Sequence, residues 1–313
     1  MTDRTPRIGI LGIMQDLYDD MIPGIAQRQA GYAAELAAQL AGVGEFIPGE
    51  PVKYREDAGR VMRQFETAGL DGVLVVMLTY GPAMRVARLL AESRLPVCLA
   101  NIQPEPAVTA AWDMADMTYN QGVHGAQDTA NAMVRAGRPF HVLTDDWRSE
   151  SFLAGIGRWA RAAAAVTAWK SLKVALFGYA MNDMGDIRVD ESALVRSLGP
   201  EILAVAPGDL HRGILAVTDD EVAEVIGFED AAFEIDPRLS AIERADHARM
   251  QVAIQRILDD RGFGAYTAHF DAIGEDGRFS RLPLAAASTL LARGYGYAAE
   301  GDVLTACLVY AGH

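Results

Sequence analysis

The sequence predicts an α/β protein with two parallel β-sheets, each covered by helices on both faces. Short runs of apolar, mostly branched residues alternate with longer stretches in which apolar residues recur every three or four positions. A continuous apolar run is typical of a strand covered on both faces, and the longer stretches are typical of amphipathic helices. Strands separated by helices favour right-handed crossovers and doubly wound, Rossmann- or flavodoxin-like sheets. The rhythm starts twice, so we predict two domains, 1–148 and 149–313.

The first domain is predicted to contain five strands. The clearest strand pattern is the apolar run within 71–78 (DGVLVVML). The predicted strands are 7–14, 45–48, 71–78, 96–100 and 139–144, and the predicted helices between them are 22–40, 55–68, 82–91 and 121–136.

The second domain is entered through a long connecting helix, predicted over 149–169. A new strand follows at 172–177 (LKVALF), and the stretch 242–258 shows one apolar helical face. The glycine-rich segment 294–302 is predicted to be a turn before the last helix. The other predicted strands are 202–205 and 264–270, and the predicted helices are 217–226, 242–258, 283–292 and 303–310.

Composition and charge exclude several classes of function. The formal net charge is −14, which argues against a nucleic-acid partner because binding phosphates needs clustered lysine and arginine. No run of about 18 apolar residues suits a membrane span, and the first residues do not fit a signal peptide. We therefore expect a soluble, cytoplasmic protein without a membrane partner.

Common catalytic and cofactor motifs are absent. The glycines at 9 and 12 lack the close spacing of a dinucleotide-binding loop, and there is no Gly-x-Ser-x-Gly sequence. No two histidines have the i, i+4 spacing of a local metal motif. Cys98 and Cys307 lie in apolar runs, so we expect buried, reduced thiols instead of a disulfide.

Polar side chains follow the predicted strands of the first domain. Ligands of open α/β sheets bind beyond the carboxyl ends of the strands. Amides that both donate and accept, together with aromatic rings, are typical of sites for hydroxyl-rich ligands such as sugars. The alternative is that these residues are polar only because loops are polar. They are Gln15, Asp16, Thr79, Tyr80, Asn101, Gln103, Asp145, Asp146 and Trp147.

His124 and His141 are predicted to have different roles. His124 is expected in the first turn of a helix, where Gly122 and Gly125 leave room for a ligand or for a neighbouring chain. His141 lies within a predicted strand and is expected to be a core residue with its hydrogen bonds satisfied.

Six segments, in order along the chain, resemble the L-arabinose isomerase family. They are 15–18 (QDLY), 78–83 (LTYGPA), 120–125 (NQGVHG), Thr144 with Trp147, 262–270 (GFGAYTAHF) and 294–302 (GYGYAAEGD). The resemblance implies interconversion of an aldose and a ketose through a cis-enediol, assisted by a divalent metal, usually Mn²⁺, that polarises the sugar oxygens.

The resemblance also assigns residues. Glu300 matches a metal ligand that is also the first of two glutamates moving protons at C1 and C2. The segment with Gln121 and His124 is expected to reach a neighbouring subunit in a homo-oligomer, typically a hexamer. The positions that match the lining of the family's sugar site are Gln15, Leu17, Tyr80, Gln121, His124 and Phe270.

The sequence departs from the family pattern in its missing ligands. The second glutamate and two metal-binding histidines belong to a C-terminal β-rich domain that has no counterpart in these residues. One carboxylate does not hold Mn²⁺ against water, so we expect little or no turnover by this chain alone. Asp16 and Leu78 replace family histidines, which indicates a divergent subgroup. The alternatives are a non-catalytic, two-domain sugar-binding module and a partner subunit that lends His124 to an intact relative.

Overall fold

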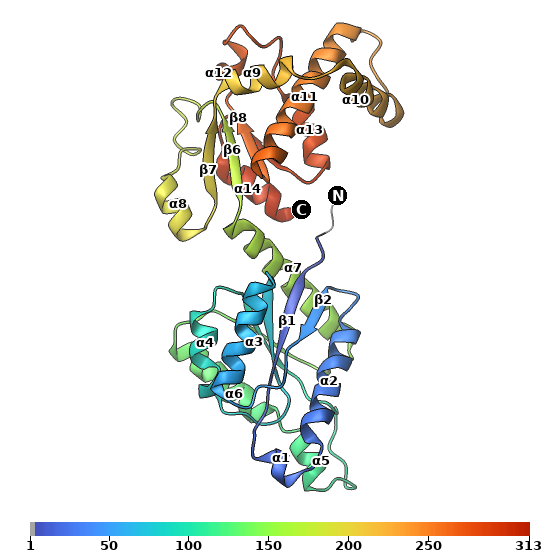
Figure 1. Cartoon of the computed structure of the whole chain (residues 1–313), viewed down its shortest axis with the longest axis vertical. Helices are drawn as coiled ribbons and strands as arrows, with labels where there is room; N and C mark the ends of the chain where they lie inside the picture. The colour runs from blue at the N-terminus through green and yellow to red at the C-terminus, as the bar shows by residue number, and fades with distance from the viewer. Residues whose placement is uncertain (1–3) are drawn as a thin grey trace. The chain divides into compact units, whose positions relative to one another are not determined.

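The chain forms two compact units, each with its own parallel sheet (Figure 1). The structure is a computed structural model that describes residues 4–313. The first unit comprises residues 4–167, and the second comprises residues 168–313. The predicted fold class, α/β with two doubly wound parallel sheets, is confirmed.

The sheet of the first unit has the strand order β2-β1-β3-β4-β5, and all its strands are parallel. This is the flavodoxin-like strand order. From β1 the chain adds β2 on one side and β3, β4 and β5 on the other, so the topological switch point lies between β1 and β3. Its strands are β1 (Arg7–Ile13), β2 (Glu45–Pro48), β3 (Gly72–Met77), β4 (Val97–Asn101) and β5 (His141–Thr144). Its helices are α1 (Tyr18–Met21), α2 (Ile25–Gln39), α3 (Arg55–Thr67), η1 (Ala83–Arg85), α4 (Ala87–Glu92), α5 (Met114–Tyr119) and α6 (Val123–Arg135).

Both faces of this sheet are buried, which explains why its strands are continuously apolar. In β3, Leu74 and Val76 belong to the core beneath α2 and α7. Their neighbours Val73 and Val75 belong to a second core beneath α3, α4 and α6. Because successive side chains of a strand point to opposite faces, a strand between two cores has no polar face.

Helix α7 (Glu150–Lys170) confirms the predicted connecting helix. The predicted boundary at 148/149 precedes this helix, whereas the compact units divide within it, between 167 and 168. Its packing onto the first sheet requires a small residue at the start of β3, because a Cβ on Gly72 would lie 3.0 Å from the Trp159 ring.

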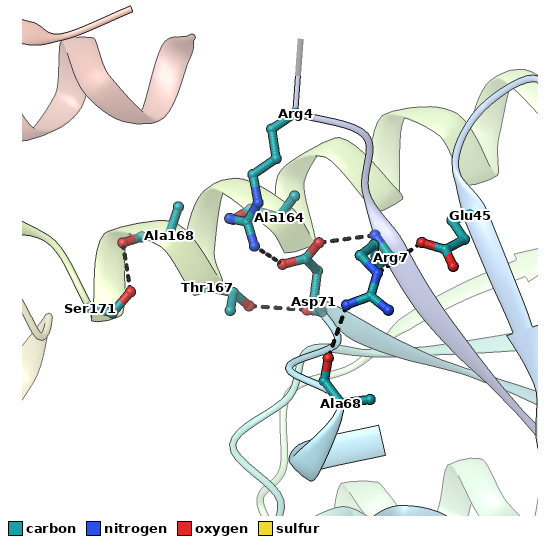
Figure 2. A network of polar contacts seen from close by, with 9 residues as sticks. All are labelled: Arg4, Arg7, Glu45, Ala68, Asp71, Ala164, Thr167, Ala168 and Ser171. Carbon is teal, nitrogen blue, oxygen red and sulfur yellow. Dashed lines mark hydrogen bonds and ion pairs between the residues drawn. The ribbon is translucent and has the colours of Figure 1, made fainter. Parts of the chain in front are cut away.

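A buried carboxylate, Asp71, ties the start of β3 to this helix and to the N-terminal residues (Figure 2). It accepts hydrogen bonds from the Arg4 guanidinium at 2.6 Å and from the Arg7 backbone N–H at 2.9 Å. The Asp71 carbonyl accepts from the Thr167 hydroxyl at 3.0 Å, and Arg4 also reaches the Ala164 carbonyl at 3.4 Å. The charge of Asp71 is therefore held by both an ion pair and a backbone donor.

The sheet of the second unit has the order β7-β6-β8-β9, again all parallel. Helix α14 covers one face, and α9, α11 and α13 contribute to the core on the other face, where α10 packs on α11. The strands are β6 (Lys173–Phe177), β7 (Glu201–Val205), β8 (Ala265–Ala268) and β9 (Gly296–Ala299). The helices are α8 (Glu191–Ser197), α9 (Pro207–Leu215), α10 (Asp219–Ala232), α11 (Ala241–Arg261), α12 (Phe270–Gly274), α13 (Leu284–Ala292) and α14 (Val303–Gly312).

Three predictions about secondary structure and burial are wrong. The segment predicted as a glycine-rich turn contains strand β9. A Cβ on Gly296 would lie 2.2 Å from the Ala306 carbonyl oxygen, so this glycine allows α14 to pack closely on β9. Phe270 begins helix α12 and does not end a strand. His141 is exposed because β5 is an edge strand of its sheet, so it is not a core residue.

Both cysteines are expected to resist thiol reagents in the folded protein. Cys98 and Cys307 are free and buried, as predicted. Burial raises the pKa of Cys98 to about 12 and that of Cys307 to about 11. Because the thiolate is the reactive form, neither thiol should react at about pH 8. A colorimetric thiol titration should find no fast-reacting thiol in native buffer and both thiols in guanidinium chloride; a stoichiometric native reaction would contradict this.

Within residues 4–313, none of the helices combines the length and the apolar character that crossing a membrane would require.

Candidate functional site

The first candidate site lies at the carboxyl edge of the first sheet, after β1 and β3. The Gln15 N–H donates to the hydroxyl of buried Thr79 at 3.1 Å, and that hydroxyl donates to the Tyr80 carbonyl at 2.8 Å. These bonds fix the two strand ends against each other. The Gln15 side-chain oxygen is buried and has no partner within the described residues, so it remains available as an acceptor.

Gln121 joins this edge from the segment before α6. Its side-chain amide donates to the Tyr18 hydroxyl at 3.0 Å. Burial raises the pKa of Tyr18, the hydrogen bond from Gln121 lowers it, and the neighbouring Tyr80 raises it. Gln15, Tyr80 and Gln121, three of the candidate sugar-site positions, thus lie at one sheet edge together with Tyr18.

Two other predicted sugar-site residues are exposed. Leu17 is 54% exposed beside the start of α1. His124 lies in the first turn of α6, as predicted, with its side chain at the surface. The glycines around it do not leave room, however. A Cβ on Gly122 would lie 3.0 Å from Met77 Cβ, and a Cβ on Gly125 would lie 2.8 Å from Met77 Sδ, so both serve packing of α6 on β3.

Several other polar strand ends are already satisfied by the protein. Asp16 pairs with Arg85 at 2.6 Å, and the hydrogen bond from Arg85 holds the pKa of Asp16 below its usual value. Asn101 donates to the Thr144 hydroxyl at 3.2 Å, and the Trp147 indole donates to the Pro104 carbonyl at 3.2 Å. These contacts support the structural alternative for Asp16, Asn101 and Trp147.

The second candidate site lies at the carboxyl edge of the second sheet and contains Glu300, the first residue after β9. The Glu300 N–H donates to the Ala268 carbonyl at 3.0 Å, and its carbonyl accepts from the Met181 N–H at 2.9 Å. Its φ of 66° is unusual for a residue with a side chain. The strand ends therefore hold Glu300 in one backbone conformation.

Glu300 is half-buried as a residue, and its carboxylate, whose oxygens are not among the buried unpaired atoms, accepts no hydrogen bond from the residues that the structure describes. Burial raises the pKa of Tyr297, and the nearby charge of Glu300 raises it further. A carboxylate on a strained, fixed backbone, without a partner among the described residues and at the edge where α/β proteins bind ligands, is a candidate reactive group.

Two residues at this edge were missed by the sequence analysis. His269 follows β8 and is fully buried, and the exposed Tyr179 follows β6, with its ring 4.1 Å from the His269 ring, centroid to centroid. His269 directly follows the end of β8, and Tyr179 lies two residues after the end of β6. A position just after a strand is the same criterion by which the sequence analysis chose candidate residues in the first unit. Phe270, predicted to line the sugar site, is half-buried at the start of α12 beside His269.

Comparison with known protein families decides the relationship. Residues 12–171 match the model of the L-arabinose isomerase N-terminal domain, and residues 173–312 match that of the L-arabinose isomerase central domain. The chain belongs to the L-arabinose isomerase family. The resemblance predicted from the six segments is therefore confirmed.

Individual L-arabinose isomerases cover most of this chain. That of Clostridium beijerinckii is 30% identical over 77% of the chain and 49% of its own length. That of Clavibacter sepedonicus is 29% identical over 91% of the chain and 58% of its own length. That of Acidothermus cellulolyticus is 28% identical over 95% of the chain and 60% of its own length. The chain thus spans about half to three-fifths of the length of these relatives.

The residues described do not by themselves form a site for the metal expected from the L-arabinose isomerase family. Among residues 4–313, no three or more histidine, cysteine, aspartate or glutamate side chains lie close enough together to hold a metal ion. Glu300 offers one carboxylate, whereas Mn²⁺ requires several oxygen or nitrogen ligands. Residues 4–313 therefore do not fit Mn²⁺ binding on their own.

Proposed function

We propose that this chain provides the sugar-binding edge and one proton-transferring carboxylate of an aldose–ketose isomerase. The observation that carries the proposal is Glu300, whose backbone is fixed beyond the strand ends by two hydrogen bonds and whose carboxylate forms no hydrogen bond or ion pair with residues 4–313. The relatives are L-arabinose isomerases, so L-arabinose and its ketose, L-ribulose, are the proposed substrate pair.

The proposed chemistry needs a group that moves protons between adjacent carbons. In the aldose-to-ketose direction, a proton leaves C2, O1 gains a proton to give the cis-enediol, C1 then gains a proton and O2 loses one. A carboxylate positioned at C1 and C2 can accept and return the carbon-bound proton as a general base and acid. We assign one of these proton transfers to Glu300.

The polar edge of the first unit, taken by itself, also suits sugar hydroxyls. Gln15 offers a buried, unpaired amide oxygen, and the linked side chains of Tyr18 and Gln121 offer further donors and acceptors. We propose that the exposed His124 and the Gln121 segment serve a neighbouring subunit in a homo-oligomer, as they are expected to do in the family.

We expect residues 1–313 alone to show no L-arabinose turnover with added Mn²⁺, because a second acid–base group and further metal ligands must join Glu300. A fusion of residues 1–313 to the C-terminal part of the Clostridium beijerinckii isomerase should convert L-arabinose to L-ribulose. In that fusion, Glu300→Gln should reduce kcat by about 10²–10⁴-fold. The exposed carboxylate of Glu234 offers a matched control, and Glu234→Gln should leave the rate unchanged.

Robust turnover by residues 1–313 alone, or an active fusion that tolerates Glu300→Gln, would overturn this assignment. The competing function, a non-catalytic sugar-binding module, predicts a different pattern. Calorimetry would then find L-arabinose affinity that neither Mn²⁺ nor Glu300→Gln changes.

A further inference from the structure

His269 carries a buried polar atom that the fold leaves without a partner. The residue is 0% exposed, and its Nε2 has no hydrogen-bond partner among the residues of the described chain. Leaving a buried donor or acceptor unpaired is costly, and such groups in native proteins call for an explanation. The other ring nitrogen, Nδ1, accepts from the Ala272 N–H at 2.9 Å, where His269 caps the N-terminus of α12.

This cap fixes the protonation pattern of the neutral ring. Because Nδ1 accepts a hydrogen bond from a backbone N–H, its lone pair is occupied, and the proton of the neutral imidazole lies on Nε2. An Nε2–H group is a donor and has no lone pair to give to a cation. His269 is therefore built to donate a hydrogen bond to a ligand oxygen, and not to bind a metal ion.

His269 and Glu300 follow neighbouring strands at the same sheet edge. The carbonyl of Ala268, the residue before His269, accepts the Glu300 N–H at 3.0 Å. The segment that carries Tyr179 is joined to Glu300 by the Met181 N–H, at 2.9 Å. The 48% exposed ring of Tyr179 packs on the imidazole at 4.1 Å, centroid to centroid. The exposed Tyr179 ring is therefore one of the groups that lie between the imidazole and solvent at the sheet edge.

We propose that His269 donates a hydrogen bond from Nε2 to the carbonyl or hydroxyl oxygen of the sugar on which Glu300 acts. The inference deepens the proposed isomerase function and rests on it. A neutral imidazole that donates from Nε2 can polarise a carbonyl oxygen without bringing a full charge. It also strengthens binding of the oxygen-rich cis-enediol without competing with Glu300 for a proton.

Two substitutions separate the donor from the helix cap. Asparagine is a strong N-cap residue, so His269→Asn keeps an acceptor for the Ala272 N–H and removes the buried Nε2–H donor. His269→Ala removes both. We expect His269→Asn to unfold at nearly the wild-type temperature but to bind L-ribulose about tenfold more weakly, which is the loss of one well-placed hydrogen bond. His269→Ala should show the weaker binding and a lower unfolding temperature.

The binding measurement is calorimetric, with L-ribulose and L-arabinose titrated into wild-type residues 1–313 and both variants, with and without Mn²⁺. Wild-type-like affinity in a folded His269→Asn variant would overturn the His269 inference and leave the isomerase proposal standing. Absence of any pentose binding by the wild type would overturn both, beginning with the proposed function.

The tautomer can be checked without any ligand. In ¹⁵N-labelled protein, the His269 ring should show its proton coupled to Nε2 and an unprotonated Nδ1, and the Nε2–H resonance should shift when L-ribulose is added. A proton on Nδ1 in the free protein would contradict the proposed donor.

Discussion

Replacing Asp71 with alanine is expected to destabilise the first unit by about 2–3 kcal/mol. The carboxylate is 0% exposed and accepts from the Arg4 guanidinium and the Arg7 N–H. Its removal deletes two hydrogen bonds to a charged group and leaves the Arg7 donor unpaired. Removing one partner from a fully buried ion pair can cost more, about 3–5 kcal/mol. Here the Arg4 side chain is 51% exposed, so water can solvate it after the change.

Urea unfolding followed by tryptophan fluorescence would measure this effect, because three of the four tryptophans, Trp112, Trp147 and Trp159, lie in the first unit. Arg4→Ala is the matched control. It removes the counter-ion but leaves the buried Asp71 charge its backbone donor, so it should cost about 1–2 kcal/mol, less than Asp71→Ala. Equal losses from both substitutions would show that the Arg7 N–H contributes nothing.

Helices and strands could be predicted from the sequence where a local pattern of apolar residues was enough to identify them. The apolar run of β3 and the connecting helix α7 were found because burial on both sheet faces and helical periodicity leave direct traces in the sequence. Strand β9 was missed because its sequence, Gly296–Ala299, is dominated by small residues. Its identity depends on pairing with β8 and on the approach of α14 to Gly296, and neither contact can be inferred from the segment itself.

The candidate site was predictable to the same degree. Gln15, Tyr80 and Gln121 were selected as candidates because they follow strands or match family segments, and Glu300 was selected because its segment resembles the family pattern. His269 was overlooked because the strand before it was extended through Phe270, which hid the strand end. Its unpaired Nε2 depends on the Ala272 cap and on the Tyr179 ring, which are contacts between residues that only the folded chain brings together. Conversely, Asp16 looked available in the sequence, but Arg85 occupies it.

Replacing Gly301 with alanine is expected to cost about 3 kcal/mol or more and to displace the segment that carries Tyr179. Gly301 has a φ of 93°, a conformation that side chains disfavour, and its added Cβ would lie 2.4 Å from the Ala180 Cα. The obstructing atom belongs to the backbone, so the chain at Ala180 must move. That movement would break the hydrogen bond from the Met181 N–H to Glu300 and lift Tyr179 from His269.

A substitution at Gly277 distinguishes the cost of the backbone conformation from the cost of the steric contact with Ala180. Gly277 has a φ of 75°, but nothing lies within 4 Å of an added Cβ, so Gly277→Ala should cost only the backbone term, about 1–2 kcal/mol. Hydrogen exchange read by mass spectrometry would localise the damage. Gly301→Ala should accelerate exchange in peptides covering 178–184 and 265–274, whereas Gly277→Ala should leave both near wild type. If both variants exchanged alike there, the contact between Gly301 and Ala180 would not be what holds Tyr179 and Glu300 in register, and the sheet edge would owe its geometry to the strands alone.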